Sequence, residues 1–302
     1  MDPLDHVRVD HDSTLALMIE CRRRGLEVRE LRQDWLFAMN GRAWSRMRTV
    51  EVGRADPHFE VVADRTAPLV ELDVLFLRKD PPVDVEFLHA TQLVDLGGGP
   101  LVINDPSGLR AANEKLFAMR YPELIPATLV TRDRHQIQSF IDRHGGVAVL
   151  KPLDGCGGAG VFKARGVDDP RLGDGMWMVQ EFLPEVEIGD KRVIVLDGEP
   201  VGAILRVPPA GAFLANLAAG GKATRSPVDA RDREICARLA PDLRQLGLFL
   251  AGIDVIGGRL TEVNVTSPTG LVEIEALGGG NVAALIVDFA VGRARKAARA
   301  TG

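Results

Sequence analysis

The residues best suited to chemistry lie in one stretch near the C-terminal end of the chain. Asp254 stands in an apolar segment, and Glu262 and Asn264 stand in the next one, after the pair Gly257-Gly258. Two glycines between apolar runs predict a tight hairpin, because both can take a positive φ. The two-residue period of a strand then puts Glu262 and Asn264 on one face, with Asp254 folded back beside them. Two carboxylates and a carboxamide in an apolar hairpin suit a hard cation such as Mg²⁺, since unpaired buried charge is costly.

The same pattern has a simpler interpretation, a half-buried hairpin that keeps one polar face in water. Taken alone, the D…E-x-N spacing favours this simpler interpretation. The segments upstream of the hairpin therefore decide between the two.

A second candidate site follows the apolar segment 147–150. Lys151 ends this expected strand, and a loop with four glycines comes next: Gly155, Gly157, Gly158 and Gly160. Glycine backbone can wrap an anion without Cβ clashes, and a lysine supplies a point charge for a phosphate. The lysine precedes the glycines and a strand follows them, so neither the GxxxxGK[ST] loop nor the GxGxxG fingerprint is present. A mobile glycine-rich hairpin is the alternative to a phosphate-binding loop.

Other polar residues end expected strands or lie on expected helices. Arg206 ends a strand just before a long loop of small residues, 208–222, which is a candidate lid. Lys115 is expected on a helix, where a lone lysine usually faces solvent. Another expected strand ends in four residues whose backbone could bind an adenine edge: Gln180, Glu181, Phe182 and Leu183.

Composition narrows the class of protein. The 302 residues are 46% hydrophobic and 26% charged, which is ordinary for a globular chain with room for two or three cores. The net charge of −5 gives no electrostatic case for nucleic-acid binding. No apolar run approaches the roughly 20 residues that span a bilayer, and the acidic start of the chain predicts no secretion signal. Three widely spaced cysteines fit a reducing compartment, so we expect a cytoplasmic protein.

Strands and helices alternate over the first hundred residues, which predicts a doubly wound α/β domain. We expect a helix capped by Asp12 up to about Arg24, and a hairpin over 35–52 that turns at Asn40-Gly41. The remaining expected elements are strand 72–77, helix 85–96, strand 101–104, a helix from residue 107, strand 128–131, helix 133–144, a hairpin over 193–206, helix 229–246 and helix 282–300.

Together these segments resemble prokaryotic glutathione synthetase, a member of the ATP-grasp superfamily. They occur in the family's order along nearly the whole chain: RKDPP from Arg78, NEKLF from Asn113, LKPLDGCGGAGVF from Leu150, QEFLP from Gln180, GDKRV from Gly189, DGEPV from Asp197, NLAAGGK from Asn216 and GIDVIGGRLTEVNVTSPTG from Gly252. The resemblance implies a mixed α/β ATP-grasp fold. Its parts would be an N-terminal pre-ATP-grasp domain over 1–112, a lid domain over 113–190 and a C-terminal domain over 191–302.

The resemblance also implies roles for the candidate residues. ATP would be held by Lys115, Lys151, the loop with Gly155, Gly157, Gly158 and Gly160, the adenine-binding run Gln180, Glu181, Phe182 and Leu183, and, on the ribose side, Asp190. Mg²⁺, with Mn²⁺ as a substitute, would be bound by Asp254, Glu262 and Asn264. The acyl phosphate and the dipeptide would lie near the catalytic Arg192 and Arg206 and near Asn216, Ser267 and Thr269.

The implied reaction joins γ-glutamylcysteine to glycine through an acyl phosphate and releases ADP and phosphate. Arg206 would neutralise the tetrahedral oxyanion, and the family implies a homo-oligomer, a tetramer. Two alternatives stay open: a carboxylate–amine ligase with a different dipeptide or amine acceptor, and a weakly active ATP-binding homologue.

Two features depart from the family's pattern. Family members typically begin with a hydrophobic strand before a Met-Asp-Pro, whereas Met1-Asp2-Pro3 comes first here. We therefore expect either a start upstream or a sheet that lacks an edge or central strand. The loop before Asn216 usually reads Thr-Arg-Gly, but here it reads Phe213-Leu214-Ala215. Leu214 replaces an arginine that would cover the site, which predicts reduced turnover or a different dipeptide.

Overall fold

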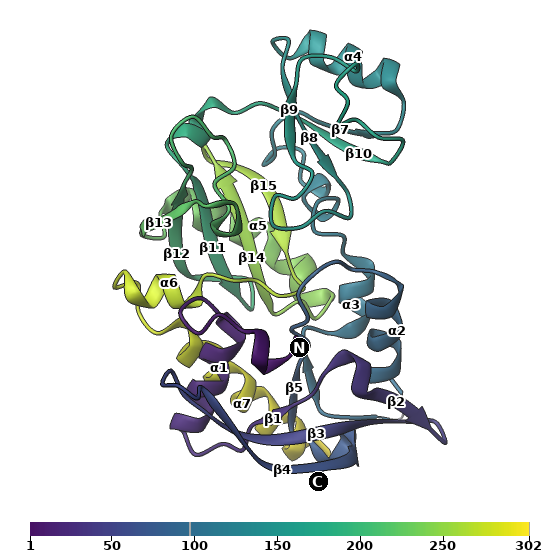
Figure 1. Cartoon of the computed structure of the whole chain (residues 1–302), viewed down its shortest axis with the longest axis vertical. Coiled ribbons are helices and arrows are strands. Elements are labelled where there is room, and N and C mark those ends of the chain that lie inside the picture. Colours follow the sequence, from purple (N-terminus) through teal and green to yellow (C-terminus); the bar gives the residue numbers. More distant parts are fainter. Residues whose placement is uncertain (97, 302) are drawn as a thin grey trace.

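The structure is a computed structural model and describes residues 1–96 and 98–301. Its elements form three tiers along the long axis of the molecule (Figure 1). The N-terminal elements and the last helix form the lowest tier, a five-stranded sheet forms the middle one, and a smaller sheet with one helix forms the upper one. None of the helices in this described part is long and apolar enough to cross a membrane.

The chain starts with one helix and an antiparallel sheet. Helix α1 (Ser13–Arg23) begins at Asp12, whose side chain accepts a hydrogen bond from the Leu15 amide at 2.7 Å. Strands β2 (Leu36–Met39) and β3 (Arg42–Val52) form the predicted hairpin, and both of its turn residues have a positive φ. Strand β1 (Arg29–Glu30) pairs with β3 beyond β2, and β4 (Phe59–Pro68) pairs along the opposite edge of β3. The sequence did not predict β4, because most of its side chains are exposed and show no apolar alternation.

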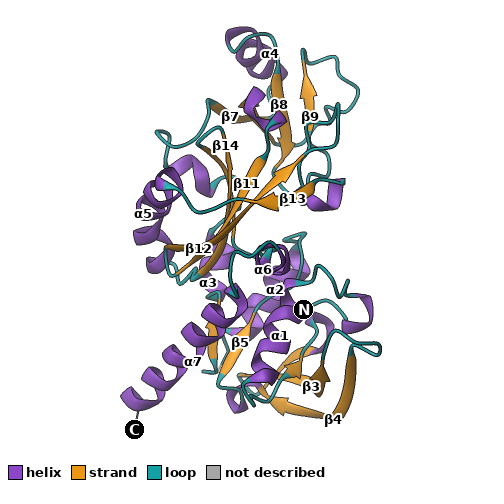
Figure 2. Cartoon of the chain, turned by 90° about the vertical axis from the view of Figure 1, so that its left-hand side faces the viewer, coloured by secondary structure: helices purple, strands orange, loops and turns teal. Residues whose placement is uncertain are grey.

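Two short parallel strands lie above this sheet, β5 (Val74–Phe76) and β6 (Leu101–Ile103). Helices α2 (Val85–Val94) and α3 (Pro106–Ala111) lie on one side of them, and α1 and α7 (Val282–Thr301) lie on the other (Figures 1 and 2). Helices on both sides agree with the doubly wound prediction. Among the described residues β5 pairs with β6 alone. Its other edge borders a cavity of about 520 Å³, which β6 does not line.

The upper tier is an antiparallel sheet with the order β7-β10-β8-β9. Its strands are β7 (Thr128–Thr131), β8 (Ala148–Pro152), β9 (Phe162–Ala164) and β10 (Trp177–Glu181). Helix α4 (Arg134–Arg143) covers one face through a core that includes Ile137, Ile141 and Leu150. Strand alternation then turns Val149 and Lys151 towards the opposite face, which looks onto the middle tier (Figure 1).

The middle tier is an antiparallel sheet with the order β13-β12-β11-β14-β15. Its strands are β11 (Asp190–Leu196), β12 (Glu199–Val207), β13 (Lys222–Arg225), β14 (Leu250–Ile256) and β15 (Arg259–Asn264). Helix α5 (Ala230–Gln245) packs on one face against Val193 and Val195. Helices α6 (Leu271–Ala276) and α7 pack on the other face against Ile194 and Leu196.

Single-turn 3₁₀ helices connect these elements. They lie at Leu4–His6, Gln33–Trp35, Leu69–Glu71, Phe117–Arg120, Pro184–Glu187 and Leu217–Ala219.

Candidate active site

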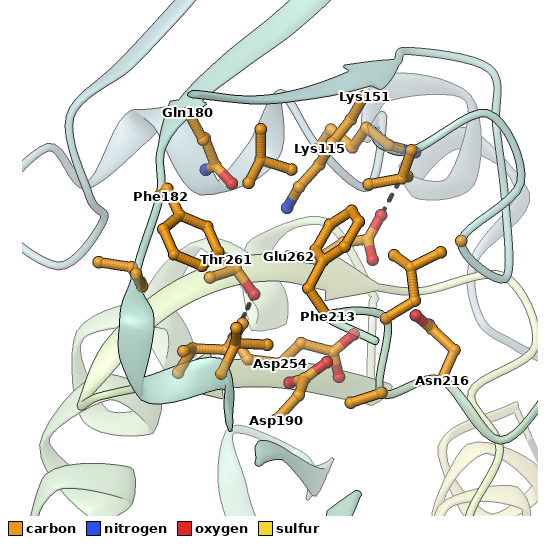
Figure 3. Close-up of a pocket in the computed structure, with 18 of the residues that line it drawn as sticks. Lys115, Lys151, Gln180, Phe182, Asp190, Phe213, Asn216, Asp254, Thr261 and Glu262 are labelled. Carbon is orange, nitrogen blue, oxygen red and sulfur yellow. Dashed lines mark hydrogen bonds and ion pairs between the residues drawn. The ribbon is translucent and has the colours of Figure 1, made fainter. Parts of the chain in front are cut away.

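A pocket lies between the upper sheet and the middle sheet (Figure 3). Both sheets and the loops 155–158 and 213–216 line it. The predicted site residues in its lining are Lys115, Lys151, Gly155, Gly157, Gly158, Gln180, Glu181, Phe182, Leu183, Asp190, Asn216, Asp254 and Glu262. Residues that are far apart in sequence therefore meet at one place, as the ATP-grasp resemblance implied.

The register of the middle sheet builds the charged floor of this pocket. Arg192 on β11 lies directly opposite Asp254 on β14, and Asp254 lies opposite Glu262 on β15. In the next row, Asp190 on β11 lies opposite Arg206 on β12. These side chains share the face on which Ile194 packs against α6 and α7 further along β11. The same face is thus apolar at one end and charged at the other.

The structure confirms the predicted hairpin, with β14 and β15 joined at Gly257-Gly258, where both glycines have a positive φ. The Asn264 amide donates to Asp254 Oδ2 at 3.2 Å, and Thr261 Oγ1 donates to the Asp254 carbonyl at 3.2 Å. Asp254, Glu262 and Asn264 therefore lie together, as the alternation of the strand predicted.

Two arginines compete for two buried carboxylates. Asp254 Oδ1 lies 2.6 Å from Arg192 Nε and 2.9 Å from Arg206 Nη2, while Asp190 Oδ2 lies 2.5 Å from Arg206 Nη2. Burial alone raises the pKa of Asp254, but the two arginines outweigh it and hold that pKa well below its usual range. For Asp190, burial outweighs Arg206 and raises the pKa to about 6. Asp254 is therefore ionised at any physiological pH, and Asp190 titrates near neutrality.

Two lysines face this floor from above (Figure 3). Lys115 Nζ donates to the Gly155 carbonyl at 2.5 Å and lies 3.3 Å from Glu262 Oε1. Lys151 has no hydrogen bond or ion pair with the residues that the structure describes, and burial lowers its pKa against the pull of Glu262. Lys151 is thus a cation in the pocket whose charge no direct partner satisfies.

Lys115 does not lie on a helix, which corrects the sequence prediction. Helix α3 ends at Ala111, and Lys115 lies in a turn before the next 3₁₀ helix. The reason is Asn113, whose side-chain oxygen accepts hydrogen bonds from the amides of Lys115 and Leu116, both at 3.0 Å. Such a local bond competes with helix continuation.

The glycine-rich loop contacts the candidate lid loop. Gly157, Gly158 and Gly160 all have a positive φ, and a Cβ at Gly158 would come within 3.1 Å of Asn216 Oδ1. Among them, Gly160 is not part of the pocket lining. Two flexible segments therefore meet above the charged floor.

Apolar side chains line the end of the pocket near Gln180 and Phe182. Gln180 and Phe182 lie at one end in Figure 3, and Asn216 lies at the other. Pro126, Val149, Val186 and Ile256 add apolar walls. Lys163 on β9 places its Nζ 4.6 Å from the ring centre of Phe182 and 5.2 Å from that of Phe213, so one lysine contacts both this end of the pocket and the 208–222 loop.

Several predicted residues lie next to the pocket without lining it. Arg192, Arg206 and Asn264 reach it through Asp254. The Ser267–Thr269 segment lies behind Arg192, whose Nη1 donates to the Thr269 carbonyl at 3.2 Å.

Sequence reasoning missed two residues that hold the hairpin in place. The Asn104 side chain donates to the carbonyls of Leu250 and Val265 and accepts from the Leu250 amide. Glu114 Oε1 accepts from the Val265 and Thr266 amides at 2.9 and 3.0 Å. Two signals in the sequence could have identified them. Asn104 is a polar residue at the end of an apolar strand, and Glu114 stands in the NEKLF segment. Phe213 and Leu214 also line the pocket, in place of the expected arginine.

The donor set at the hairpin fits a hard divalent cation. Asp254, Glu262 and Asn264 offer two carboxylates and a carboxamide, and Arg192 and Arg206, which pair with Asp254 in this structure, keep that carboxylate ionised. In the described part of the chain no three His, Cys, Asp or Glu side chains form a metal cluster by themselves. Asn264 and a ligand from solvent or substrate therefore have to complete the coordination.

Two family models match the chain, one over its N-terminal third and one over most of the rest. Residues 1–110 match the family described as "Prokaryotic glutathione synthetase, N-terminal domain", and residues 114–279 match "Prokaryotic glutathione synthetase, ATP-grasp domain". The glutathione synthetase of Salmonella typhimurium is 40% identical over 309 residues, which cover 98% of each chain. That of Yersinia pestis is 43% identical over 290 residues, with 91% of this chain and 90% of the relative covered.

Solved structures support the fold. The ATP-grasp ligase PsnB complexed with a minimal precursor superposes with a TM-score of 0.61 at 17% identity, over 92% of this chain and 93% of that one. A RimK domain ATP-grasp protein from Sphaerobacter thermophilus gives 0.60 at 17% identity, over 94% and 96%. With family matches over most of its length and relatives at 40% and 43% identity, the chain belongs to the prokaryotic glutathione synthetase family of ATP-grasp proteins.

Proposed function

We propose that this protein is an ATP-dependent ligase that joins γ-glutamylcysteine to glycine and releases ADP and phosphate. Family membership implies ATP use, a divalent metal and small-molecule substrates. The observation that carries the proposal is the pocket itself. It combines a glycine-rich loop, two lysines and an acidic hairpin, with two arginines paired to the same carboxylate.

In this proposal the nucleotide lies between the two sheets. Gln180, Glu181, Phe182 and Leu183 hold the adenine, and Asp190 lies on the ribose side. Lys115 and Lys151 bind the phosphates, and the loop with Gly155, Gly157, Gly158 and Gly160 closes over them. The unsatisfied charge of Lys151 supports its role, because a phosphate would supply the missing partner.

Asp254, Glu262 and Asn264 would hold the divalent cation, Mg²⁺ or Mn²⁺ in its place. When bound, the cation neutralises charge on the phosphates that are being transferred. Glu262 already bridges Lys115 and the hairpin, so it would lie between cation and lysine.

In the ligation the protein would position the substrates and stabilise negative charge, without forming a covalent bond to either substrate. The cysteinyl carboxylate attacks the γ-phosphorus and displaces ADP, and the acyl phosphate that forms is a better acyl donor than a carboxylate. The glycine amine attacks the acyl carbon, Arg206, with Arg192 beside it, stabilises the tetrahedral oxyanion, and the intermediate collapses to the amide as phosphate leaves and the amine loses a proton to solvent. Asn216, Ser267 and Thr269 hold the dipeptide, and the two meeting loops exclude water that would hydrolyse the intermediate.

A second candidate function is a ligase with a different dipeptide or amine acceptor. The observation that favours it is the apolar lining at Phe213 and Leu214, where an arginine was expected. Where the family has an arginine that would cover the site, this loop presents apolar side chains, which favours a different substrate.

We further propose a division into 1–112, 113–190 and 191–302, a homotetramer and a cytoplasmic location. The upper sheet and α4 share a hydrophobic core of their own, which supports residues 113–190 as a separate domain. The oligomer is testable by light scattering of the purified protein.

The test measures ADP release with Mg²⁺ and ATP, adding γ-glutamylcysteine and glycine together and each alone. We expect release that requires both substrates, together with a product of the mass of glutathione. Release with the dipeptide and another amino acid, but not with glycine, would favour the second candidate. Binding of ATP without substrate-dependent release would contradict both and favour the weakly active homologue.

A further inference from the structure

The candidate lid loop places a phenylalanine inside the pocket. Phe213 belongs to the pocket lining together with Lys115, Lys151, Asp190 and Asp254. Figure 3 shows its ring at a level between the two lysines above and the two aspartates below. In the proposed function this is the space for the phosphates and the cation. An apolar ring therefore lies where charged ligands would bind.

With the loop in this position the pocket has little free space. Its free volume is about 90 Å³. An apolar cavity of about 150 Å³ holds a single benzene molecule. A purine base with its ribose and phosphates is much larger than benzene, so it does not fit beside Phe213. The loop has to move away from the charged floor before a nucleotide can enter.

Few polar contacts hold this part of the loop. Among the residues that the structure describes, the hydrogen bonds of 208–216 all stay within the loop, such as that from the Ala212 amide to the Pro209 carbonyl at 2.9 Å. Residues 208–216 include no charged side chain, so they form no ion pair. Side-chain contacts therefore have to hold the segment, and segments with few such contacts open at low free-energy cost.

Lys163 provides a charged contact to this segment from the upper sheet. Its Nζ lies 5.2 Å from the ring centre of Phe213 and 4.6 Å from that of Phe182. On β9 it lies opposite Val149, a residue of the pocket wall, and Phe182 directly follows β10. A cation above an aromatic ring is attracted to it, by about two- to fivefold in an equilibrium constant at an exposed site. Lys163 therefore holds the Phe213 ring against the upper sheet.

We propose that Phe213 is a plug in the nucleotide pocket, that Lys163 holds it there, and that a nucleotide enters only after the plug has left. The proposal rests on the proposed function, which places the nucleotide in this pocket. Only the open fraction of the molecules can then bind, and the apparent affinity is lowered by that fraction. Weakening the plug strengthens nucleotide binding, whereas loss of a residue that holds the nucleotide would weaken it.

The first experiment measures the Kd for ATP with Mg²⁺ by calorimetry, without dipeptide and glycine. Phe213→Ala removes the ring, and we expect the Kd to fall about fivefold or more. Lys163→Met keeps an apolar stem and removes the cation, so the Kd should fall about two- to fivefold. Lys163→Arg keeps a cation above the ring and should restore the wild-type Kd.

The second experiment follows loop opening with no nucleotide present. Cys156 lines the pocket on the glycine-rich loop, which contacts the candidate lid loop. Burial raises the pKa of Cys21 to about 11 and that of Cys236 to about 12, so these two thiols react slowly at neutral pH. We expect iodoacetamide to modify Cys156 faster in Phe213→Ala and in Lys163→Met than in the wild type. Peptide mass spectrometry reads the rate at each cysteine.

The matched control is Arg171→Met. Arg171 also lies above a ring of the upper sheet, with its Cζ 4.4 Å from the ring centre of Phe162. Phe162 packs in the core that α4 covers, and neither residue lines the pocket. We expect the wild-type Kd for ATP and the wild-type labelling rate of Cys156 in this variant.

An unchanged or higher Kd for ATP in Phe213→Ala would overturn the proposal, and so would equal labelling rates of Cys156 in all these proteins. Faster labelling in the two variants, without ATP binding in any protein, would support the plug and overturn the nucleotide site of the proposed function. The two measurements therefore separate a failure of this inference from a failure of the proposed function.

Discussion

At the residue scale, Asp254 and Asp190 differ in the number of arginines that form ion pairs with them. Asp254 is paired with both Arg192 and Arg206, whereas Asp190 shares only Arg206. Both carboxylates are buried, which raises the pKa of each; the two paired arginines outweigh burial for Asp254, whereas for Asp190 burial outweighs Arg206 and the charge of Asp254 adds to the rise. Asp254 keeps its negative charge, and the pKa of Asp190 is raised to about 6.

The raised pKa of Asp190 predicts a pH dependence of stability in the ligand-free protein. Its pKa is about 6 in the folded state against an ordinary value of 3.8. Between these values the folded state binds more protons than the unfolded state, so Asp190 makes the protein less stable as pH rises through about 6. Asp190→Asn removes this dependence. We expect the unfolding free energy of the wild type to fall by about 1 kcal/mol relative to Asp190→Asn between pH 5 and pH 7.

Urea unfolding of both proteins at several pH values between 5 and 7 measures this difference. The comparison is made as a slope against pH, so a constant loss of stability from the substitution itself does not matter. Parallel curves for the two proteins would show that the pKa of Asp190 is not raised.

At the element scale, the hairpin β14–β15 and the glycine-rich loop could be predicted because their signals are local. Gly257-Gly258 gives the turn, and strand alternation places Glu262 and Asn264 beside Asp254. Lys115 was placed wrongly because the bond that ends helix α3 comes from a side chain, that of Asn113. Such a competing bond cannot be recognised from apolar periodicity.

The contact between the glycine-rich loop and the lid loop gives a test at this scale. Gly158 has a φ of +88°, and an added Cβ would lie 3.1 Å from Asn216 Oδ1 and 3.8 Å from a methyl group of Leu214. Gly158→Ala strains the backbone by about 1–2 kcal/mol and presses on the lid. We expect the KM for ATP to rise about five- to thirtyfold in steady-state kinetics.

Gly173→Ala is the control for this substitution. Gly173 lies in the loop before β10 of the same sheet, has no positive φ, and has nothing within 4 Å of an added Cβ. Its KM for ATP should equal that of the wild type. Equal values for Gly158→Ala as well would show that the loop does not close over the nucleotide.

At the scale of the whole molecule, the N-terminal part contributes to a site formed by the other two tiers. Asn104 holds the hairpin through Leu250 and Val265, and Arg78 holds the loop behind it. Sequence alternation predicted the α/β class and the order of elements. It did not predict these contacts, because they join segments about 150 to 190 residues apart whose meeting depends on the complete fold. The cavity beside β5 likewise could not be predicted from the sequence, because residues from α1, α2, α7 and β5 line it together.

The central claim is that this pocket forms an acyl phosphate from a dipeptide carboxylate and passes the acyl group to glycine. The most direct measurement uses γ-glutamylcysteine whose cysteinyl carboxylate carries two ¹⁸O atoms, with ATP, Mg²⁺ and glycine. One oxygen of that carboxylate has to leave with the phosphate and the other has to stay in the new amide. We predict phosphate that carries one ¹⁸O and a tripeptide that carries one, both read by mass spectrometry. Unlabelled phosphate, with ADP formed at the same rate, would contradict the acyl-phosphate route and the role assigned to this pocket.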